Sequence, residues 1–273
     1  MDTREVQLSN KHAKILDRIL TVCQADERIL GVFLVGSYVK GLPDEHSDLD
    51  LYVVITDGDH SDFVATRESF VQLLGEPAFV EDFDIPNVVF LIFLDGSEVE
   101  IHYVPESQAG QVFDAPYQVL LDKSDIAAKI TSHEHKSDTS IQIEKLRRLI
   151  QWFWHDFSHF TTALARNQLW WAYGQLEVLR SICVGLARLR NDFSDPEVDD
   201  DVYFKIEKAL PVDQLSALQS TFCAMDQDAI LNAGVVLVEF YKELASSLAS
   251  EHALPYPSAL EIVMVERLKK VGE

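Results

Sequence analysis

The stretch FLVGSYVKGLPDEHSDLDLYV, residues 33–53, decides the fold of the first half of the chain. An apolar run ends at Gly36-Ser37, a polar loop follows, and a second strand-like segment then carries Asp48 and Asp50. Strand residues two apart share a face, so both carboxylates point the same way. Like charges this close repel unless a cation lies between them or one is protonated. The spacing suits a hard divalent cation such as Mg²⁺, although an aspartate pair alone also suits an edge strand with a solvated face.

Two further features accompany the aspartate pair. The glycine at the end of the first strand lets a backbone N–H come close to a phosphate, and the serine adds a hydroxyl donor. The later segment EVEIHYV places Glu98, Glu100 and His102 on one strand face. Glu98 lies next to a turn, so Glu100 is the better candidate for a third carboxylate. The chain contains neither a P-loop pattern nor a strand–GxGxxG–helix pattern.

The charge of the chain is strongly negative and uneven. The 45 acidic and 23 basic residues give a net charge of −22, and residues 1–130 carry 24 acidic and 9 basic side chains, a net charge of −15. Such a field repels nucleic acid and attracts cationic ligands. A surface charged for solubility explains the same excess, so both interpretations stay open.

Cysteine usage and hydropathy indicate a soluble protein of the cytoplasm, with no membrane partner. The three cysteines, Cys23, Cys183 and Cys223, are far apart and form no CxxC motif, which is typical of reduced thiols. The chain has no signal-peptide pattern, and no apolar run approaches the ~18 residues of a membrane span.

Hydrophobic patterning predicts an α+β fold in two domains. A mixed sheet with flanking helices is expected over residues 1–131, and an all-helical bundle over residues 132–273, with the polar segment SHEHKSDTS at the boundary. The predicted strands cover 29–35, 49–56, 87–94, 98–104 and 117–122, and the predicted helices cover 7–24, 61–74, 140–165, 168–190, 201–209, 213–224, 227–250 and 258–270.

These motifs carry a resemblance to a known superfamily. The run GSYVKGLPDEHSDLDLYVV resembles the signature of the DNA polymerase β-like nucleotidyltransferases. DERILGVFLVGSYVKG, LIFLDGSEVEIHYVP and the helical run LIQWFWHDFSHFTTALARNQLWWAYGQLEVLR are similar to the antibiotic nucleotidyltransferases, particularly the streptomycin 6-adenylyltransferases. The resemblance covers roughly residues 12–190, and it departs at position 100, where glutamate replaces the usual aspartate.

The resemblance implies a polymerase β-like nucleotidyltransferase domain followed by the helical domain. The implied reaction is transfer of AMP from ATP to a hydroxyl of a small cationic antibiotic, and the acidic excess favours an aminoglycoside. Asp48 and Asp50 would hold Mg²⁺, and Glu100 would ligate a metal, deprotonate the hydroxyl, or both. Gly36 and Ser37 would hold the β- and γ-phosphates of the nucleotide.

The helical half supplies weaker candidates. Lys145 and Arg148 are placed to reach the triphosphate, and ion pairing along the helix explains them equally well. His155 and His159 stand four apart, which suits a metal site, a substrate pocket or ordinary packing. The candidates for acceptor contacts are Glu98, His102, Trp154, His155 and His159.

Other functions remain as alternatives to this reading. In the first alternative the enzyme modifies a lincosamide. In the second it modifies a protein or RNA, as toxin–antitoxin nucleotidyltransferases do. RNA is disfavoured by the negative charge. A non-catalytic nucleotide-binding interaction protein is a third, but it has no reason to keep three mutually repelling carboxylates. A monomer and a homodimer are both compatible with the sequence.

Overall fold

The computed structural model describes residues 10–41, 43–44, 46–81, 85–111, 116–130, 139–195, 198 and 201–271. The chain divides into two compact units, Met1–His135 and Lys136–Glu273. The first contains a mixed sheet with helices and the second is helical, so the predicted fold class is confirmed. The predicted boundary at residue 131 falls outside the described residues and stays a prediction.

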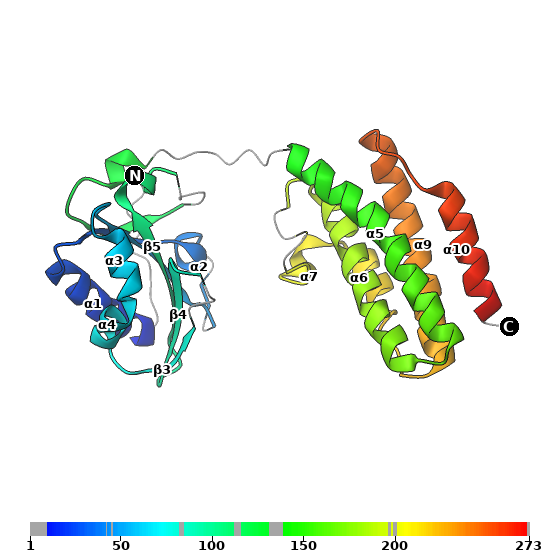
Figure 1. The fold of residues 1–273 in the computed structure, drawn as a ribbon, viewed down its shortest axis with the longest axis horizontal. Helices are drawn as coiled ribbons and strands as arrows, with labels where there is room; N and C mark the ends of the chain where they lie inside the picture. The colour runs from blue at the N-terminus through cyan, green and yellow to red at the C-terminus, as the bar shows by residue number, and fades with distance from the viewer. Residues whose placement is uncertain are drawn as a thin grey trace. The chain divides into compact units, whose positions relative to one another are not determined.

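The first unit is built on one sheet, which contains six strands within the described ranges, in the order β3-β4-β5-β2-β1-β6 (Figure 1). Strands β2 and β5 are parallel, and the other neighbouring pairs are antiparallel. The strands are β1 Ile29–Leu34, β2 Leu49–Ile55, β3 Pro77–Glu81, β4 Val88–Phe93, β5 Glu98–Pro105 and β6 Gln118–Asp122.

Helices α1 (Asn10–Ala25), α3 (His60–Ala65) and α4 (Arg67–Leu74) cover one face of this sheet (Figure 1). Their apolar side chains form a core with every second residue of β2 and β5, represented by Ile19 and Phe63 from the helices and by Leu51 and Ile101 from the strands. Because side chains alternate along a strand, the polar residues between these core positions lie on the opposite face.

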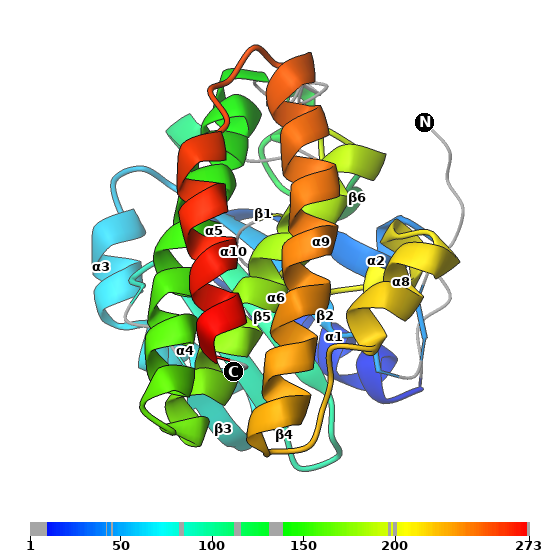
Figure 2. The same ribbon diagram turned by 90° about the vertical axis from the view of Figure 1, so that its right-hand side faces the viewer.

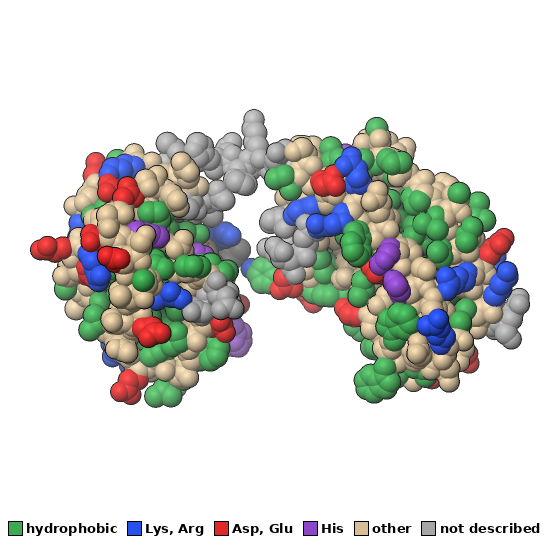
Figure 3. Space-filling view, in the orientation of Figure 1, with side chains coloured by type: hydrophobic (Ala, Val, Ile, Leu, Met, Phe, Trp, Pro, Cys, Tyr) green, Lys and Arg blue, Asp and Glu red, His purple; other side chains and the backbone are tan. Residues whose placement is uncertain are grey.

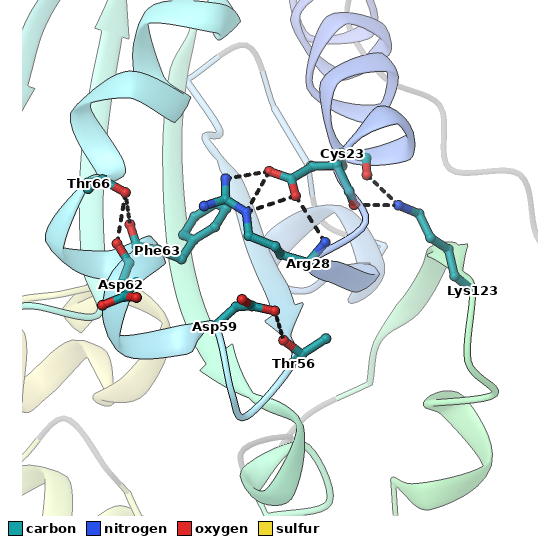
Figure 4. A network of polar contacts seen from close by, with 9 residues as sticks. Cys23, Arg28, Thr56, Asp59, Asp62, Phe63, Thr66 and Lys123 are labelled. Atoms are coloured by element: carbon teal, nitrogen blue, oxygen red, sulfur yellow. Dashed lines mark hydrogen bonds and ion pairs between the residues drawn. The ribbon is translucent and has the colours of Figure 1, made fainter.

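A polar network ties the end of α1 to strands β1 and β6 (Figure 4). Lys123 Nζ donates to the carbonyl oxygens of Cys23 at 2.7 Å and Asp26 at 2.8 Å. These carbonyls lie at or just beyond the helix C-terminus, where a cation is favourable. The Arg28 guanidinium pairs with the Asp26 carboxylate and lies 4.6 Å from the centre of the Phe63 ring in α3. The network therefore fixes α1 on the sheet.

The first unit departs from the predicted elements at three places. Strand β3 was not predicted, because its residues are mostly exposed and show no alternation. The single predicted helix over 61–74 is two helices, which meet at Thr66. The Thr66 hydroxyl donates to the Asp62 carbonyl at 2.8 Å, the local bonding by which threonine competes with a regular helix. Gly36–Val39, expected as a loop, forms the short helix α2.

The second unit is a bundle of long helices that run side by side (Figures 1 and 2). Its core includes Phe153 and Tyr241, whose rings stack 3.7 Å apart, and Tyr241 Oη donates to the Ile150 carbonyl at 2.8 Å. The helices are α5 Thr139–Ala165, α6 Leu169–Asn191, α7 Ile206–Ala209, α8 Val212–Gln219, α9 Gln227–Glu251 and α10 Ser258–Val271.

The predicted helix over 201–209 is wrong in its first half. Lys205 has a left-handed backbone (φ 52°), which interrupts a right-handed helix, and α7 begins only after it. The other predicted helices of this half are present. Among the described helices, none has the length and apolar character needed to span a bilayer.

Candidate active site

Two carboxylates face each other on the sheet surface opposite the helices. Asp50 of β2 and Glu100 of β5 are register partners across the parallel strand pair. Each is half-buried, whereas the residues that flank each of them along its strand are fully buried. Neighbouring strands lie about 4.8 Å apart, so the two acidic side chains are adjacent. The predicted placement of Asp50 and Glu100 on polar strand faces agrees with this geometry.

The turn after β1 lies directly against the Asp50 carboxylate. Gly36 has φ +72°, and a Cβ at this position would lie 1.7 Å from Asp50 Oδ2. The neighbouring Val35 N–H donates to the Asp50 carbonyl at 3.0 Å. The sequence suggests that glycine at position 36 allows a phosphate to approach the backbone closely. The structure gives a second reason for glycine here, because any side chain at this position would displace Asp50.

Ser37 carries a hydroxyl with unused hydrogen-bonding capacity. Its Oγ is buried and has no hydrogen-bond partner among the described residues. Buried polar atoms are nearly always hydrogen-bonded, so an unpartnered one calls for an explanation. A ligand oxygen that accepts from this hydroxyl would satisfy it.

The electrostatics of this cluster favour a bound cation. Burial, together with the nearby Asp48 and Glu100 carboxylates, raises the pKa of Asp50 to about 6. Asp48 lies immediately before β2. Carboxylate oxygens are the donors that Mg²⁺ prefers, and a cation would offset their repulsion. The donor chemistry therefore fits the ion, although among the described residues no three His, Cys, Asp or Glu side chains form a ready metal cluster.

His102 organises the second carboxylate. Its Nε2 lies 2.6 Å from Glu100 Oε1, and this hydrogen bond holds the pKa of Glu100 below its ordinary value. The imidazole also stacks on Tyr52, with ring centres 4.7 Å apart and an angle of 13°. Tyr52 was not among the predicted site residues, although its place two residues after Asp50 on β2 puts it on the same face. Glu98 shares this face of β5, and its predicted contact with an acceptor stays a prediction.

The predicted contact between Trp154 and the acceptor is wrong for this structure. Trp154 is fully buried, and its ring packs edge-on against Phe153, Phe157 and Tyr241. A ligand cannot reach it without opening the core of the helical unit. The ring of Trp152, two residues earlier on α5, is accessible instead, with 52% of its surface exposed.

His155 and His159 lie together on the outside of α5. Their ring centres are 4.9 Å apart, and the face of the helical unit drawn in Figure 3 shows two histidine side chains in contact. His155 Nδ1 lies 3.1 Å from Asp156 Oδ1. The rings of Trp152 and Trp171 flank the pair, 5.2 Å from His155 and 5.9 Å from His159 respectively. This mixed aromatic and acidic surface suits a polar organic cation.

The two predicted basic contacts also lie on α5. Arg148 borders a cavity of about 280 Å³, whose other lining residues include Trp152, Asp156 and Ser181. Lys145 is half-buried one turn earlier. Both side chains have interactions within the protein, and their contact with a triphosphate stays a prediction.

Comparison with known families decides the class of the protein. The profile of the streptomycin adenylyltransferase family matches residues 10–271. The chain belongs to the streptomycin adenylyltransferase family. It is an adenylyltransferase of the polymerase β-like nucleotidyltransferase superfamily. Membership implies a nucleotide co-substrate, ATP, and a small-molecule substrate.

Structural comparison finds proteins of related description at low identity. An aminoglycoside 6-adenyltransferase from Bacillus subtilis matches with 16% identity and a TM-score of 0.41, covering 97% of this chain and 99% of that one. A nucleotidyltransferase-like protein from Exiguobacterium sibiricum matches with 13% identity and a TM-score of 0.38, covering 86% and 76%. A CdnE c-di-GMP synthase from Capnocytophaga granulosa matches with 12% identity and a TM-score of 0.31, covering 87% and 82%. No curated protein sequence matches the chain.

Proposed function

We propose that this member of the streptomycin adenylyltransferase family transfers AMP from ATP to a hydroxyl of a small cationic antibiotic, an aminoglycoside, and so confers resistance. The observation that carries the proposal is the facing pair of Asp50 and Glu100 beside the Gly36 turn. Family membership supports adenylyl transfer. The net charge of −22 supports a cationic acceptor.

The residues proposed to bind the triphosphate and its metal ion lie on and next to β1, β2 and β5 of the first unit. Asp48, Asp50 and Glu100 are the residues that would hold Mg²⁺, which when bound neutralises phosphate charge and aligns the reacting groups. The Gly36 turn provides a backbone that can approach a phosphate closely, and the buried Ser37 hydroxyl donates to a phosphate oxygen.

Glu100 is the proposed general base. The carboxylate accepts the proton as the acceptor hydroxyl attacks the α-phosphorus, a new O–P bond forms, and pyrophosphate leaves. The hydrogen bond from His102 lowers the pKa of Glu100 further below neutral, so the carboxylate is in the ionised form that a base requires. The same bond, with the stack of His102 on Tyr52, limits the orientations that the carboxylate can adopt.

The acceptor contacts are proposed from charge and exposure. Glu98 offers a carboxylate on the same strand face as Glu100. On α5 the exposed ring of His155 contacts the rings of Trp152 and His159, and its Nδ1 pairs with the Asp156 carboxylate. Aromatic faces and carboxylates together suit a polyhydroxylated molecule with ammonium groups.

The test is a transfer assay with labelled ATP and Mg²⁺ against a panel of aminoglycosides and neutral lincosamides. Pyrophosphate release and an adenylylated product identify the acceptor. Asp50→Asn is expected to abolish transfer, whereas Asp17→Asn, which removes one exposed carboxylate from α1, leaves it intact. If Asp50→Asn retained the wild-type rate, the assignment of the phosphate site would be overturned.

Two alternative acceptors are distinguished by the same assay. A lincosamide that outperforms every aminoglycoside would replace the cationic acceptor by a neutral one. Labelling of a protein or RNA, with no small-molecule product, would indicate a toxin–antitoxin type of nucleotidyltransferase. RNA is the weaker of these because the first 130 residues carry a net charge of −15. The non-catalytic alternative is set aside, because the chain belongs to an enzyme family.

A further inference from the structure

The first turn of α1 contacts both arms of the candidate active site. His12 Nδ1 lies 2.5 Å from Tyr38 Oη, and Tyr38 follows Ser37 directly within α2. The preceding residue, Lys11, donates from Nζ to the Gly96 carbonyl at 2.8 Å. Gly96 belongs to the turn that leads from β4 into the strand of Glu100. The first turn of α1 is therefore hydrogen-bonded both to α2, which contains Gly36 and Ser37, and to the β4–β5 hairpin, which carries Glu100.

The His12–Tyr38 contact is buried. His12 is 0% exposed and Tyr38 is 3% exposed, and their rings meet edge-on with centres 5.5 Å apart. A hydrogen bond excluded from water is stronger than a surface one, and losing one partner leaves the other unsatisfied. Burial also lowers the pKa of His12. A neutral imidazole has one donor and one acceptor nitrogen, so Nδ1 can pair with the hydroxyl in either tautomer.

Helix α2 needs such an external support. It has only four residues, and at its end the Lys40 N–H donates to the Gly36 carbonyl at 3.2 Å. A helix this short does not hold its own conformation in water. The orientation of Ser37 therefore depends on the contacts that hold α2. Tyr38 makes one of them: it is buried in the same core as Ile15 and Ile19 of α1, and its hydroxyl is hydrogen-bonded to His12.

We propose that His12 and Tyr38 are positioning residues for nucleotide binding: their hydrogen bond fixes α2 so that Gly36 and Ser37 present their donors to the phosphates of ATP. The proposal rests on the proposed function, because it assumes that this turn binds the triphosphate. Neither residue touches the nucleotide. Their effect is on the affinity for ATP and not on the proton transfer at Glu100.

The test compares two conservative substitutions in the same core. Tyr38→Phe removes the hydroxyl bonded to His12, and Tyr103→Phe removes a buried hydroxyl that has no hydrogen-bond partner among the described residues. Tyr38→Phe is expected to raise the Kd of a non-hydrolysable ATP analogue and the KM for ATP about tenfold, while kcat at saturating ATP and the acceptor KM change less than about twofold. Tyr103→Phe is expected to change none of these constants.

Substitutions at the other partner provide a rescue test. An asparagine amide places a polar atom near the position of imidazole Nδ1, so His12→Asn is expected to bind ATP more tightly than His12→Leu. Adding Tyr38→Phe to His12→Leu is expected to cause no further loss, because both changes remove the same bond. The comparison of His12→Asn with His12→Leu decides the question even if Tyr38→Phe is too unstable to assay: equal ATP affinities in these two variants would overturn the proposal.

Two outcomes separate this proposal from the proposed function. A folded Tyr38→Phe with wild-type affinity for the ATP analogue would overturn the positioning role and leave adenylyl transfer untouched. An equal rise of the ATP and acceptor KM values would also overturn it, because it would indicate general loosening of the fold. A wild-type protein that binds no ATP in the presence of Mg²⁺ would instead overturn the proposed function.

Discussion

Gly36 and Gly41 adopt nearly the same backbone conformation in different surroundings. Their φ values are +72° and +71°, but a Cβ at position 36 would collide with Asp50 and one at position 41 would meet nothing within 4 Å. Alanine in a left-handed conformation costs about 1–2 kcal/mol at either position. Gly36→Ala is expected to displace the Asp50 carboxylate as well, and to lower turnover about a hundredfold.

Gly41→Ala serves as the control that isolates the backbone cost. Urea unfolding gives the free energy of unfolding of each variant, and a transfer assay gives its turnover. We expect Gly41→Ala to lose stability and keep its activity. Equal losses of turnover in the two variants would contradict the contact between Gly36 and Asp50.

The pH dependence of stability reports the repulsion at Asp50. Its pKa in the folded protein is about 6, above the ordinary value of 3.8, so the fold disfavours the ionised carboxylate. The resulting destabilisation is complete above pH 6 and disappears as the pH falls towards 4. Asp50→Asn is therefore expected to be more stable than wild type at pH 8 without metal, by about 1–2 kcal/mol, and to lose this advantage near pH 4.

Unfolding measured by circular dichroism at the two pH values, with and without Mg²⁺, checks this expectation. Added Mg²⁺ should stabilise the wild type, because the ion binds the folded state and offsets the repulsion. Asp50→Asn should respond weakly. A variant that is less stable than wild type at pH 8 in the absence of metal would show that Asp50 is held by favourable interactions instead.

At the scale of elements, the packing of α9 against α5 depends on a glycine. A Cβ at Gly234 would lie 2.4 Å from Cε1 of Phe160, whereas a Cβ at Gly174 in α6 would meet nothing within 4 Å. Gly234→Ala is expected to destabilise the protein by about 1–3 kcal/mol, because Phe160 is fully buried and must shift. Gly174→Ala is expected to stabilise it by about 0.5–1 kcal/mol through helix propensity. Thermal unfolding of the two variants measures both signs, and a stabilising Gly234→Ala would contradict the packing of α9.

Elements were predictable from the sequence where one face of a regular element is buried. β2 and β5 alternate buried and half-buried residues over most of their length, and the same alternation placed Asp50 and Glu100 on the polar face. Strand β3 has three exposed central residues and gives no such signal. Helix α2 is shorter than the two turns that a helical period requires.

The sequence predicted only those site residues whose placement follows from alternation along one strand, namely Asp50 on β2 and Glu100 on β5. The contacts of His12 with Tyr38 and of Gly36 with Asp50 join different elements, and no local pattern encodes them. Trp154 was misassigned because α5 carries aromatic residues on several faces, and sequence spacing did not distinguish the buried ring from the exposed ring of Trp152.

At the scale of the whole molecule, the net charge of −22 predicts a dependence of acceptor binding on salt. Long-range attraction between an acidic protein and a polycation is screened within about 8–10 Å at physiological ionic strength. The KM for an aminoglycoside is therefore expected to rise steeply between low and high salt, whereas the KM of any neutral acceptor stays nearly constant. Steady-state kinetics over a salt series measures this. An aminoglycoside KM that does not change would assign the charge to solubility.

The most direct test of the central claim replaces the proposed base, Glu100, and keeps Asp48, Asp50 and the Gly36 turn. Adenylylation of an aminoglycoside by wild type and by Glu100→Gln is measured in single-turnover experiments, alongside the affinity of each protein for a non-hydrolysable ATP analogue with Mg²⁺. The account predicts a loss of at least about a hundredfold in the rate of transfer. The affinity for the analogue is expected to stay within about threefold. Wild-type rates in Glu100→Gln, or a wild-type enzyme that modifies no aminoglycoside, would contradict it.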